Sequence, residues 1–222
     1  MPVAQPDPAA DQAAIDTTYH ATDFLRDFRA TPEQMVDLER FRQRVAETNK
    51  VMNLVGPNTL PAFWSRHAAD SAQLLKLAPG ARTWADLGAG AGFPGVVLAI
   101  MLKGVPGAQV HLIDSLTKRC RFLEVAVSEL DLPAEVHCAR AETLKLRVDV
   151  VTARACAPLH KLLGFARPYL AMDAEGLFLK GENVLAELDE ARRAWTFDAD
   201  LLPSFSNSNG RIVRLRRLAR AR

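Results

Sequence analysis

Residues 83–100 read TWADLGAGAGFPGVVLAI. A short apolar run that contains Asp86 is typical of a buried strand, and it leads into a loop where Gly88, Gly90 and Gly92 alternate with alanine. A second apolar run begins at Gly95 and indicates a helix. Because glycine accepts positive φ angles and lets another group approach the backbone closely, this stretch predicts a ligand-binding turn between a strand and a helix.

The chain beyond this turn alternates short apolar runs with helical segments. We expect strands at 83–88, 109–114, 134–139, 148–153 and 176–181, and helices at 95–103, 117–131, 158–170 and 183–195. This alternation is typical of a parallel sheet with helices on both faces. Two further apolar runs, 197–205 and 211–218, flank the turn-rich SNSNG segment and predict an antiparallel hairpin. The outline is that of an α/β, Rossmann-like fold of the class I S-adenosylmethionine-dependent methyltransferases.

The residues before the sheet have a different character. Residues 1–16 are rich in proline, alanine and aspartate, and we expect a disordered leader there. Apolar residues three and four positions apart predict amphipathic helices over 17–80, which form a small N-terminal helical extension. The methyltransferase domain is predicted to span 81–222.

Composition narrows the class of protein further. The 222 residues include three cysteines, Cys120, Cys138 and Cys156, without a C-x-x-C pair, which argues against a disulfide framework and a zinc knuckle and fits a reducing cytoplasm. The net charge is only +2, although residues 211–222 carry six arginines and no acid. Such a tail serves either as a footprint for nucleic acid or as a solubilising end. We expect a cytoplasmic monomer that binds neither a membrane nor a metal ion.

The spacing of the glycines separates two classes of adenosine cofactor. Dinucleotide binding requires a third glycine at position 93, where this chain has Phe93, and Pro94 lacks the backbone donor that a pyrophosphate uses. S-adenosylmethionine has no phosphates and does not need either feature. Asp114 ends the second predicted strand, where an acid bonds ribose hydroxyls, although it could equally cap the next helix. The backbone at Ala141 and Glu142 is a candidate for adenine, with a surface ion pair as the alternative role of Glu142.

Several motifs together point to one family. The segments NKVMNLVG, RHAADS, DLGAGAGFPGVVLAI, LIDSLTKRCRFL and TARACAPL follow one another in the order seen in the bacterial 16S ribosomal RNA guanine-N7 methyltransferases. The chain resembles this family, called RsmG and formerly GidB, from about Phe41 to Lys180. The resemblance implies methyl transfer from S-adenosylmethionine to N7 of a guanine in 16S rRNA of the small ribosomal subunit, guanine 527 in the usual rRNA numbering.

The glycine loop and the resemblance together nominate site residues. The predicted cofactor-binding residues are Gly88, Gly90, Phe93, Asp114, Ser115, Ala141, Glu142 and Arg154. The candidates for contact with RNA are Arg66, Lys118, Arg119 and Lys180. No catalytic residue is certain, and Arg154 and Lys180 are the candidates. We expect His67 to be structural or to face RNA, because guanine N7 carries no proton for a base to remove.

Other functions remain open at this stage. A nicotinamide-dependent oxidoreductase would need the third glycine and a hydride-handling acid or base, and neither is evident. A non-catalytic RNA-binding protein that keeps a methyltransferase shell would not need an intact glycine loop. A methyltransferase that acts on a different RNA or on a small molecule is the main alternative.

Overall fold

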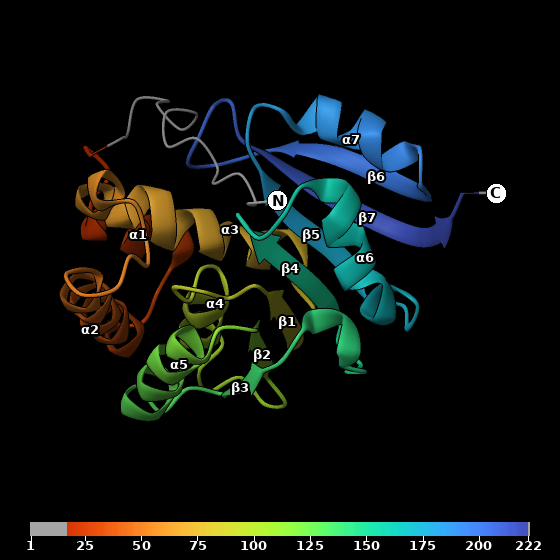
Figure 1. Cartoon of the computed structure of the whole chain (residues 1–222). Helices are drawn as coiled ribbons and strands as arrows, with labels where there is room; N and C mark the ends of the chain where they lie inside the picture. Colours follow the sequence, from red (N-terminus) through yellow and green to blue (C-terminus); the bar gives the residue numbers. More distant parts are fainter. Residues whose placement is uncertain (1–16, 222) are drawn as a thin grey trace.

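The computed structural model describes residues 17–221, and the predicted leader at 1–16 lies outside them. The strands are β1 (Thr83–Leu87), β2 (Gln109–Asp114), β3 (Ala134–Cys138), β4 (Val150–Arg154), β5 (Glu175–Lys180), β6 (Trp195–Pro203) and β7 (Arg211–Arg220). They form one sheet in the order β3-β2-β1-β4-β5-β7-β6 (Figure 1). Strands β1 to β5 are parallel, and β7 runs antiparallel to both β5 and β6. The predicted parallel sheet and its closing hairpin are therefore confirmed.

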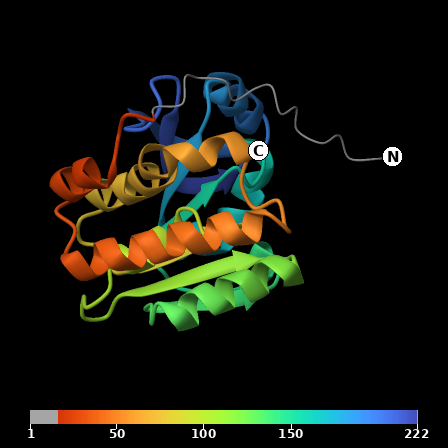
Figure 2. The ribbon, with the colours of Figure 1, turned by 90° about the vertical axis from the view of Figure 1, so that its left-hand side faces the viewer.

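Helices cover both faces of the sheet. The α-helices are α1 (Ala21–Phe28), α2 (Pro32–Asn49), α3 (Asp70–Leu77), α4 (Gly95–Met101), α5 (Thr117–Glu129), α6 (Leu159–Leu170) and α7 (Val184–Arg192). Shorter segments are the 3₁₀-helices η1 (Pro57–Ala62) and η3 (Ala141–Thr143) and the π-helical η2 (Phe63–Ala69). Figure 1 shows α6 and α7 on one side of the sheet and α1 to α5 on the other, and Figure 2 views the second side directly. None of the helices between residues 17 and 221 combines the length and the apolar character that crossing a bilayer requires.

Several predicted boundaries differ from the structure by one to three residues, and one helix illustrates why. The helix predicted for 183–195 ends at Arg192, because Trp195 begins β6 and is buried. Its indole N–H donates to the carbonyl of His160 at 3.1 Å, which ties the start of the hairpin to α6. Trp195, which the sequence pattern assigned to a helix, thus starts the edge strand β6, and aromatic side chains also pack well in strands.

The N-terminal helices share a core with the sheet. Thr31 caps α2 by accepting a hydrogen bond from the amide of Gln34, with Pro32 at the first helical position. Phe41 of α2 is fully buried, and its ring centroid lies 5.3 Å from that of Phe93 in the glycine loop. The helical extension therefore packs directly against the loop after β1. The predicted division of the chain at residue 81 into two regions stays a prediction.

Candidate functional site

The glycine loop after β1 is shaped partly by the packing of the protein on itself. Gly88 has a φ of 70°, and a Cβ there would lie 2.6 Å from the sulfur of Cys156. Gly92 has a φ of 88°, and a Cβ there would lie 2.8 Å from the Phe41 ring. Real Cβ atoms do not make such short contacts, so at these two positions the protein itself requires glycine. The close approach that the sequence predicted is thus made here by neighbouring side chains.

Gly90 differs from its neighbours because a Cβ there would make only ordinary van der Waals contacts. Its φ of 52° favours glycine, yet a Cβ there would approach its surroundings no closer than 3.5 Å, with the Asp114 carboxylate and the Arg119 guanidinium among the nearest groups. The amide of Gly90 donates to Oδ2 of Asp114 at 3.0 Å. Gly90 is therefore the glycine of this loop whose missing side chain leaves space beside polar groups.

Asp86 lies at the centre of this site and is fully buried in β1. Its Oδ2 atom accepts a hydrogen bond from the amide of Gly95 at 2.8 Å, at the start of α4. Its Oδ1 atom is buried and has no hydrogen-bond donor among residues 17–221. Burial raises the pKa of Asp86 to about 7, although the Gly95 amide acts in the opposite direction. A buried acceptor without a donor fits a ligand that brings a cationic or N–H group.

Asp114 connects the end of β2 with the glycine loop and with α5. Its Oδ1 accepts from the amide of Leu116 at 2.8 Å, just before α5, while Oδ2 accepts from Gly90. Arg119 lies 3.7 Å from the same carboxylate, and the neighbouring Ser115 is exposed. The predicted contact of Asp114 with ribose stays a prediction, whereas its bonds to two backbone amides are present in the structure. Asp114 holds the chain entering α5, and it places a carboxylate beside Gly90.

The segment after β3 forms the short helix η3. The hydroxyl of Tyr169 on α6 donates to the carbonyl of Ala141 at 2.8 Å and holds this turn in place. The amides of Ala141 and Glu142 are the first in η3, and the first amides of a helix have no intrahelical acceptor. The Glu142 carboxylate lies 3.6 Å from the exposed Arg140 side chain, which is the surface ion pair that the sequence left open.

Arg154 ends β4 and joins three segments that are distant in the sequence. Its guanidinium donates to the carbonyl of Arg66 at 2.8 Å and to Nδ1 of His67 at 2.9 Å, and it lies 3.4 Å from Asp70. Its Cζ atom lies 5.0 Å from the centroid of the Phe93 ring. Burial lowers the pKa of Arg154, and Asp70 opposes this effect. The cation is therefore fixed by η2 and α3 rather than free in the cleft.

The geometry determines which nitrogen of His67 carries the proton. Arginine has only donors, so Nδ1 of His67 accepts from Arg154 and Nε2 bears the hydrogen. Nε2 then donates to the hydroxyl of Thr59 at 3.0 Å, which donates to the carbonyl of Gly56 at 2.7 Å. Burial, Arg154 and Arg66 keep the pKa of His67 well below its usual value. His67 is a neutral ring that holds Arg154.

Phe93 lies at the back of the site. It is 3% exposed, and its ring stacks on His67 with centroids 4.6 Å apart and an interplanar angle of 23°. The rings of Phe41 and Phe63 surround it at 5.3 and 6.0 Å. Phe93 therefore packs against both the His67 ring and the guanidinium of Arg154 and helps to hold them in place.

Lys180 ends β5 and is 9% exposed in its side chain. Its ammonium donates to the carbonyl of Ala157 and to the Glu187 carboxylate, both at 2.7 Å. The same carboxylate accepts from the amide of Leu159 at 2.6 Å. Lys180 therefore holds the loop between β4 and α6.

The other basic candidates are distributed differently. Lys118 is exposed and Arg119 is partly exposed, both on the first turn of α5 beside the glycine loop. Arg66 of η2 is half-buried next to Arg154. The arginines of the tail mostly contact the hairpin itself or the neighbouring strand β5. Arg211 bonds nearby carbonyls, Arg214 and Arg216 pair with Glu175, Arg217 pairs with Asp198, and Arg220 covers the ring of Trp195.

The predicted residues gather at one edge of the sheet. The loops after β1, β2, β3, β4 and β5 all lie at the carboxyl ends of parallel strands, where ligands bind in open α/β folds. A cavity of about 480 Å³ between Thr83, Asp149 and Met172 lies at the opposite, amino ends of β1 and β4. It is therefore not part of this site. Sequence reasoning missed the roles of Asp86 and Asp70, although an acid immediately before a glycine loop is a visible signal for the first.

Comparisons with known proteins agree with this geometry. The family model GidB, described as rRNA small subunit methyltransferase G, matches residues 34–213. A relative from Caulobacter vibrioides named "Ribosomal RNA small subunit methyltransferase G" is 60% identical over 98% of this chain and 100% of its own length. A protein of the same name from Methylorubrum populi is 43% identical over 88% of this chain and 94% of its own.

Solved structures share the fold at low sequence identity. An O-methyltransferase from Bacillus cereus in complex with SAH has a TM-score of 0.57 at 15% identity, covering 90% of this chain and 99% of that one. A SAM-dependent methyltransferase from Aquifex aeolicus has a TM-score of 0.52 at 17% identity, covering 78% of this chain and 97% of that one. These likenesses confirm the predicted class I fold. By the family model and its relatives, the chain belongs to the GidB family, the rRNA small subunit methyltransferase G proteins.

Proposed function

We propose that this protein transfers a methyl group from S-adenosylmethionine to N7 of a guanine in 16S rRNA of the small ribosomal subunit. Membership of the GidB family supports the enzyme class, the cofactor and the rRNA acceptor. The N7 position comes from the family resemblance and from the character of the site. The observation that carries the proposal is the buried Oδ1 atom of Asp86 beside the glycine loop, which has no hydrogen-bond donor among residues 17–221 and fits the ammonium group of the cofactor.

The residues at the carboxyl ends of the strands fit S-adenosylmethionine. The free Oδ1 of Asp86 would accept from the ammonium group of the methionine part. The Asp114 carboxylate beside Gly90 would accept from the ribose hydroxyls, with Ser115 next to it. The first amides of η3, at Ala141 and Glu142, would face the adenine edge. When bound, the cofactor supplies an electrophilic methyl group that moves to the acceptor by in-line displacement.

The residues of this chain bind and orient the reactants without moving a proton. Guanine N7 has a lone pair and no hydrogen, so a base at the nucleophile is unnecessary. The state of His67 is consistent with this role. Its Nδ1 already accepts a hydrogen bond from Arg154, and the pKa of the ring is held well below its usual value. The rate gain is then expected from proximity and orientation, which contribute ~7–11 kcal/mol in favourable cases.

The cations near the cleft divide into two groups. Lys118 and Arg119 on α5 are accessible, and we propose that they contact RNA phosphates. Arg154 and Lys180 are bound to the protein's own carbonyls and acids, and we propose that they position the loops of the site. Arg66 belongs to neither group. Its backbone carbonyl accepts a hydrogen bond from Arg154, and its side chain is half-buried.

Methyl transfer to different acceptors tests the proposal. Purified protein with labelled S-adenosylmethionine is incubated with naked 16S rRNA or with small subunits that lack the modification, and label in the RNA is counted. Label in 16S rRNA but not in 23S rRNA supports the proposal. Tight binding of the cofactor without label in either form of 16S rRNA would favour another RNA or a small-molecule acceptor. The predictions of a cytoplasmic location and a monomeric state remain predictions.

A further inference from the structure

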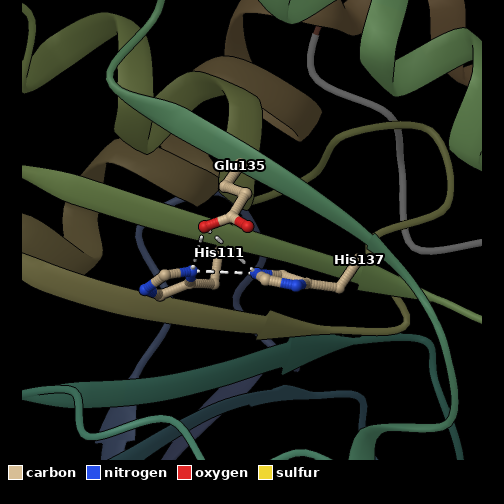
Figure 3. A group of neighbouring side chains, drawn as sticks. All are labelled: His111, Glu135 and His137. Carbon is tan, nitrogen blue, oxygen red and sulfur yellow. Dashed lines mark hydrogen bonds and ion pairs between the residues drawn. The ribbon is translucent and has the colours of Figure 1, made fainter.

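A group of three side chains lies on strands β2 and β3, away from the cofactor site. His111 pairs in register with Glu135, and Ile113 pairs with His137 (Figure 3). Because side chains alternate along a strand, these four residues share one face of the sheet. Ile113 is buried in the core that α6 and α7 cover, so His111, Glu135 and His137 lie on that face at the open edge of the sheet.

The spacing of the three groups matches a metal site. Nδ1 of His111 lies 2.9 Å from Nε2 of His137, and the Glu135 carboxylate lies 3.6 Å and 3.7 Å from these two atoms. Zinc bonds of 2.0–2.1 Å in tetrahedral geometry place ligand atoms about 3.3 Å apart. The three observed distances bracket that value. Movements of a few tenths of an ångström would bring all three atoms onto one ion.

The chemistry of the group also suits a metal. The two imidazoles are largely buried, with side chains 14% and 16% exposed, while Glu135 is 59% exposed at the rim. Two imidazoles and one carboxylate leave further coordination positions for water, as in open zinc sites.

A hydrogen bond between the two rings explains only part of this arrangement. One neutral imidazole can donate to the other at 2.9 Å, which satisfies one nitrogen of each ring. The Glu135 carboxylate, at 3.6 and 3.7 Å, is too distant for a hydrogen bond to either of the two nitrogens. A metal ion shared by the two imidazoles and the carboxylate would use all three groups.

We propose that His111, Glu135 and His137 bind a divalent first-row transition metal, with Zn²⁺ as the best match. The ion would join β2 to β3, which is the edge strand of the sheet. Sequence analysis predicted no metal, because the three ligands come from two strands whose register the sequence alone does not show. The proposal does not depend on the methyl-transfer reaction.

Titration calorimetry with Zn²⁺ tests this site on the full chain after treatment with a chelator. We expect one Zn²⁺ per chain. The substitutions His111→Gln, Glu135→Gln and His137→Gln remove ligands, and each should weaken binding by at least about 100-fold, since loss of a supporting partner alone costs 10–100-fold. Mg²⁺, which prefers all-oxygen sites, should not compete.

Two control variants make the result specific. His160→Gln removes a histidine that also lies beside an acid, 3.3 Å from Glu190, and it should bind Zn²⁺ as the unaltered protein does. Cys138→Ser removes the exposed thiol next to His137, and its affinity should also be unchanged. Absence of saturable Zn²⁺ binding would overturn the proposal. So would binding that survives His137→Gln or is lost in Cys138→Ser.

A second readout guards against variants that merely fold poorly. Co²⁺ in a site with nitrogen and oxygen ligands gives visible absorption bands that report its geometry. The unaltered protein should show bands of low-coordinate Co²⁺, and His111→Gln should lose them while keeping its far-UV circular dichroism. Bands that are identical in the two proteins would contradict the assignment.

Discussion

Substitution of Asp86 by asparagine isolates the charge at the centre of the site. Asparagine keeps the shape and the oxygen that accepts from Gly95, but it does not ionise. In the folded protein, burial raises the pKa of Asp86 to about 7, whereas the unfolded chain has the usual value of 3.8. Between these values the folded state holds a proton that the unfolded state has released. The stability contributed by this group is therefore fully present below pH 3.8 and is lost as the pH rises through 7.

The size of the effect follows from the titration curve. Between pH 6 and pH 8, a carboxyl with a pKa of about 7 goes from roughly nine-tenths to roughly one-tenth protonated. Integrated over this range, the loss of stability corresponds to about one pKa unit, or roughly 1 kcal/mol. Asp86→Asn lacks this titrating group. From pH 6 to pH 8, its free energy of unfolding should therefore fall by roughly 1 kcal/mol less than that of the unaltered protein.

The same titration should appear in cofactor binding. If the ionised Asp86 pairs with the ammonium group, the affinity of the unaltered protein for S-adenosylmethionine should rise about 10-fold from pH 6 to pH 8. The affinity of Asp86→Asn should be nearly flat and about 10- to 100-fold weaker at pH 8, as expected for a lost hydrogen bond between charged groups.

Urea unfolding and calorimetry at pH 6 and pH 8 measure both quantities in the two proteins. Other titrating groups are common to both, so the comparison between them isolates Asp86. Equal pH dependence of unfolding in the two proteins would refute the assigned pKa. Equal affinity for the cofactor would refute the contact between Asp86 and the ammonium group.

Four further substitutions separate packing from binding. Gly88→Ala should destabilise the protein by about 1–3 kcal/mol in urea unfolding, and Cys156→Ala should restore part of this loss if the predicted clash is its cause. Gly90→Ala, which meets no close neighbour, should cost only about 1 kcal/mol of stability yet weaken cofactor binding in calorimetry by a larger factor. Arg154→Lys keeps the charge but loses the fork that spans three acceptors, so kcat/KM should fall at least about 10-fold, and the midpoint of thermal unfolding should also fall because buried acceptors lose their donor. Lys180→Met should destabilise the folded protein by about 1–3 kcal/mol in urea unfolding, because the Ala157 carbonyl and the Glu187 carboxylate both lose the ammonium donor; an unchanged midpoint would show that this lysine does not support the loop.

The parts of the fold that follow from local pattern were predictable. Alternating apolar runs placed every strand within a few residues, and the SNSNG turn placed the antiparallel hairpin. The place of the candidate site follows from chain order, since the glycine loop follows β1 and Asp114 ends β2. The spacing of glycines also excluded a pyrophosphate, because Phe93 stands in the third position.

The contacts between distant segments were not predictable. Thr59, His67 and Arg154 meet only because η1 and η2 pack beside the end of β4, and no local pattern shows this. The sequence left open whether the tail arginines face nucleic acid, whereas the register of β7 against β5 places Arg214 and Arg216 beside Glu175. Pairing of this kind depends on tertiary structure.

The most direct test of the central claim is the chemical position of the transferred methyl group. Labelled 16S rRNA from the methyl-transfer reaction is treated with borohydride and aniline, which cleave the strand at N7-methylguanine, and the ends are mapped. Cleavage at a single guanine that requires both the protein and S-adenosylmethionine is the predicted result. Label in the RNA without any cleavage would place the methyl group on another atom, and it would contradict the account of a site that works without a base.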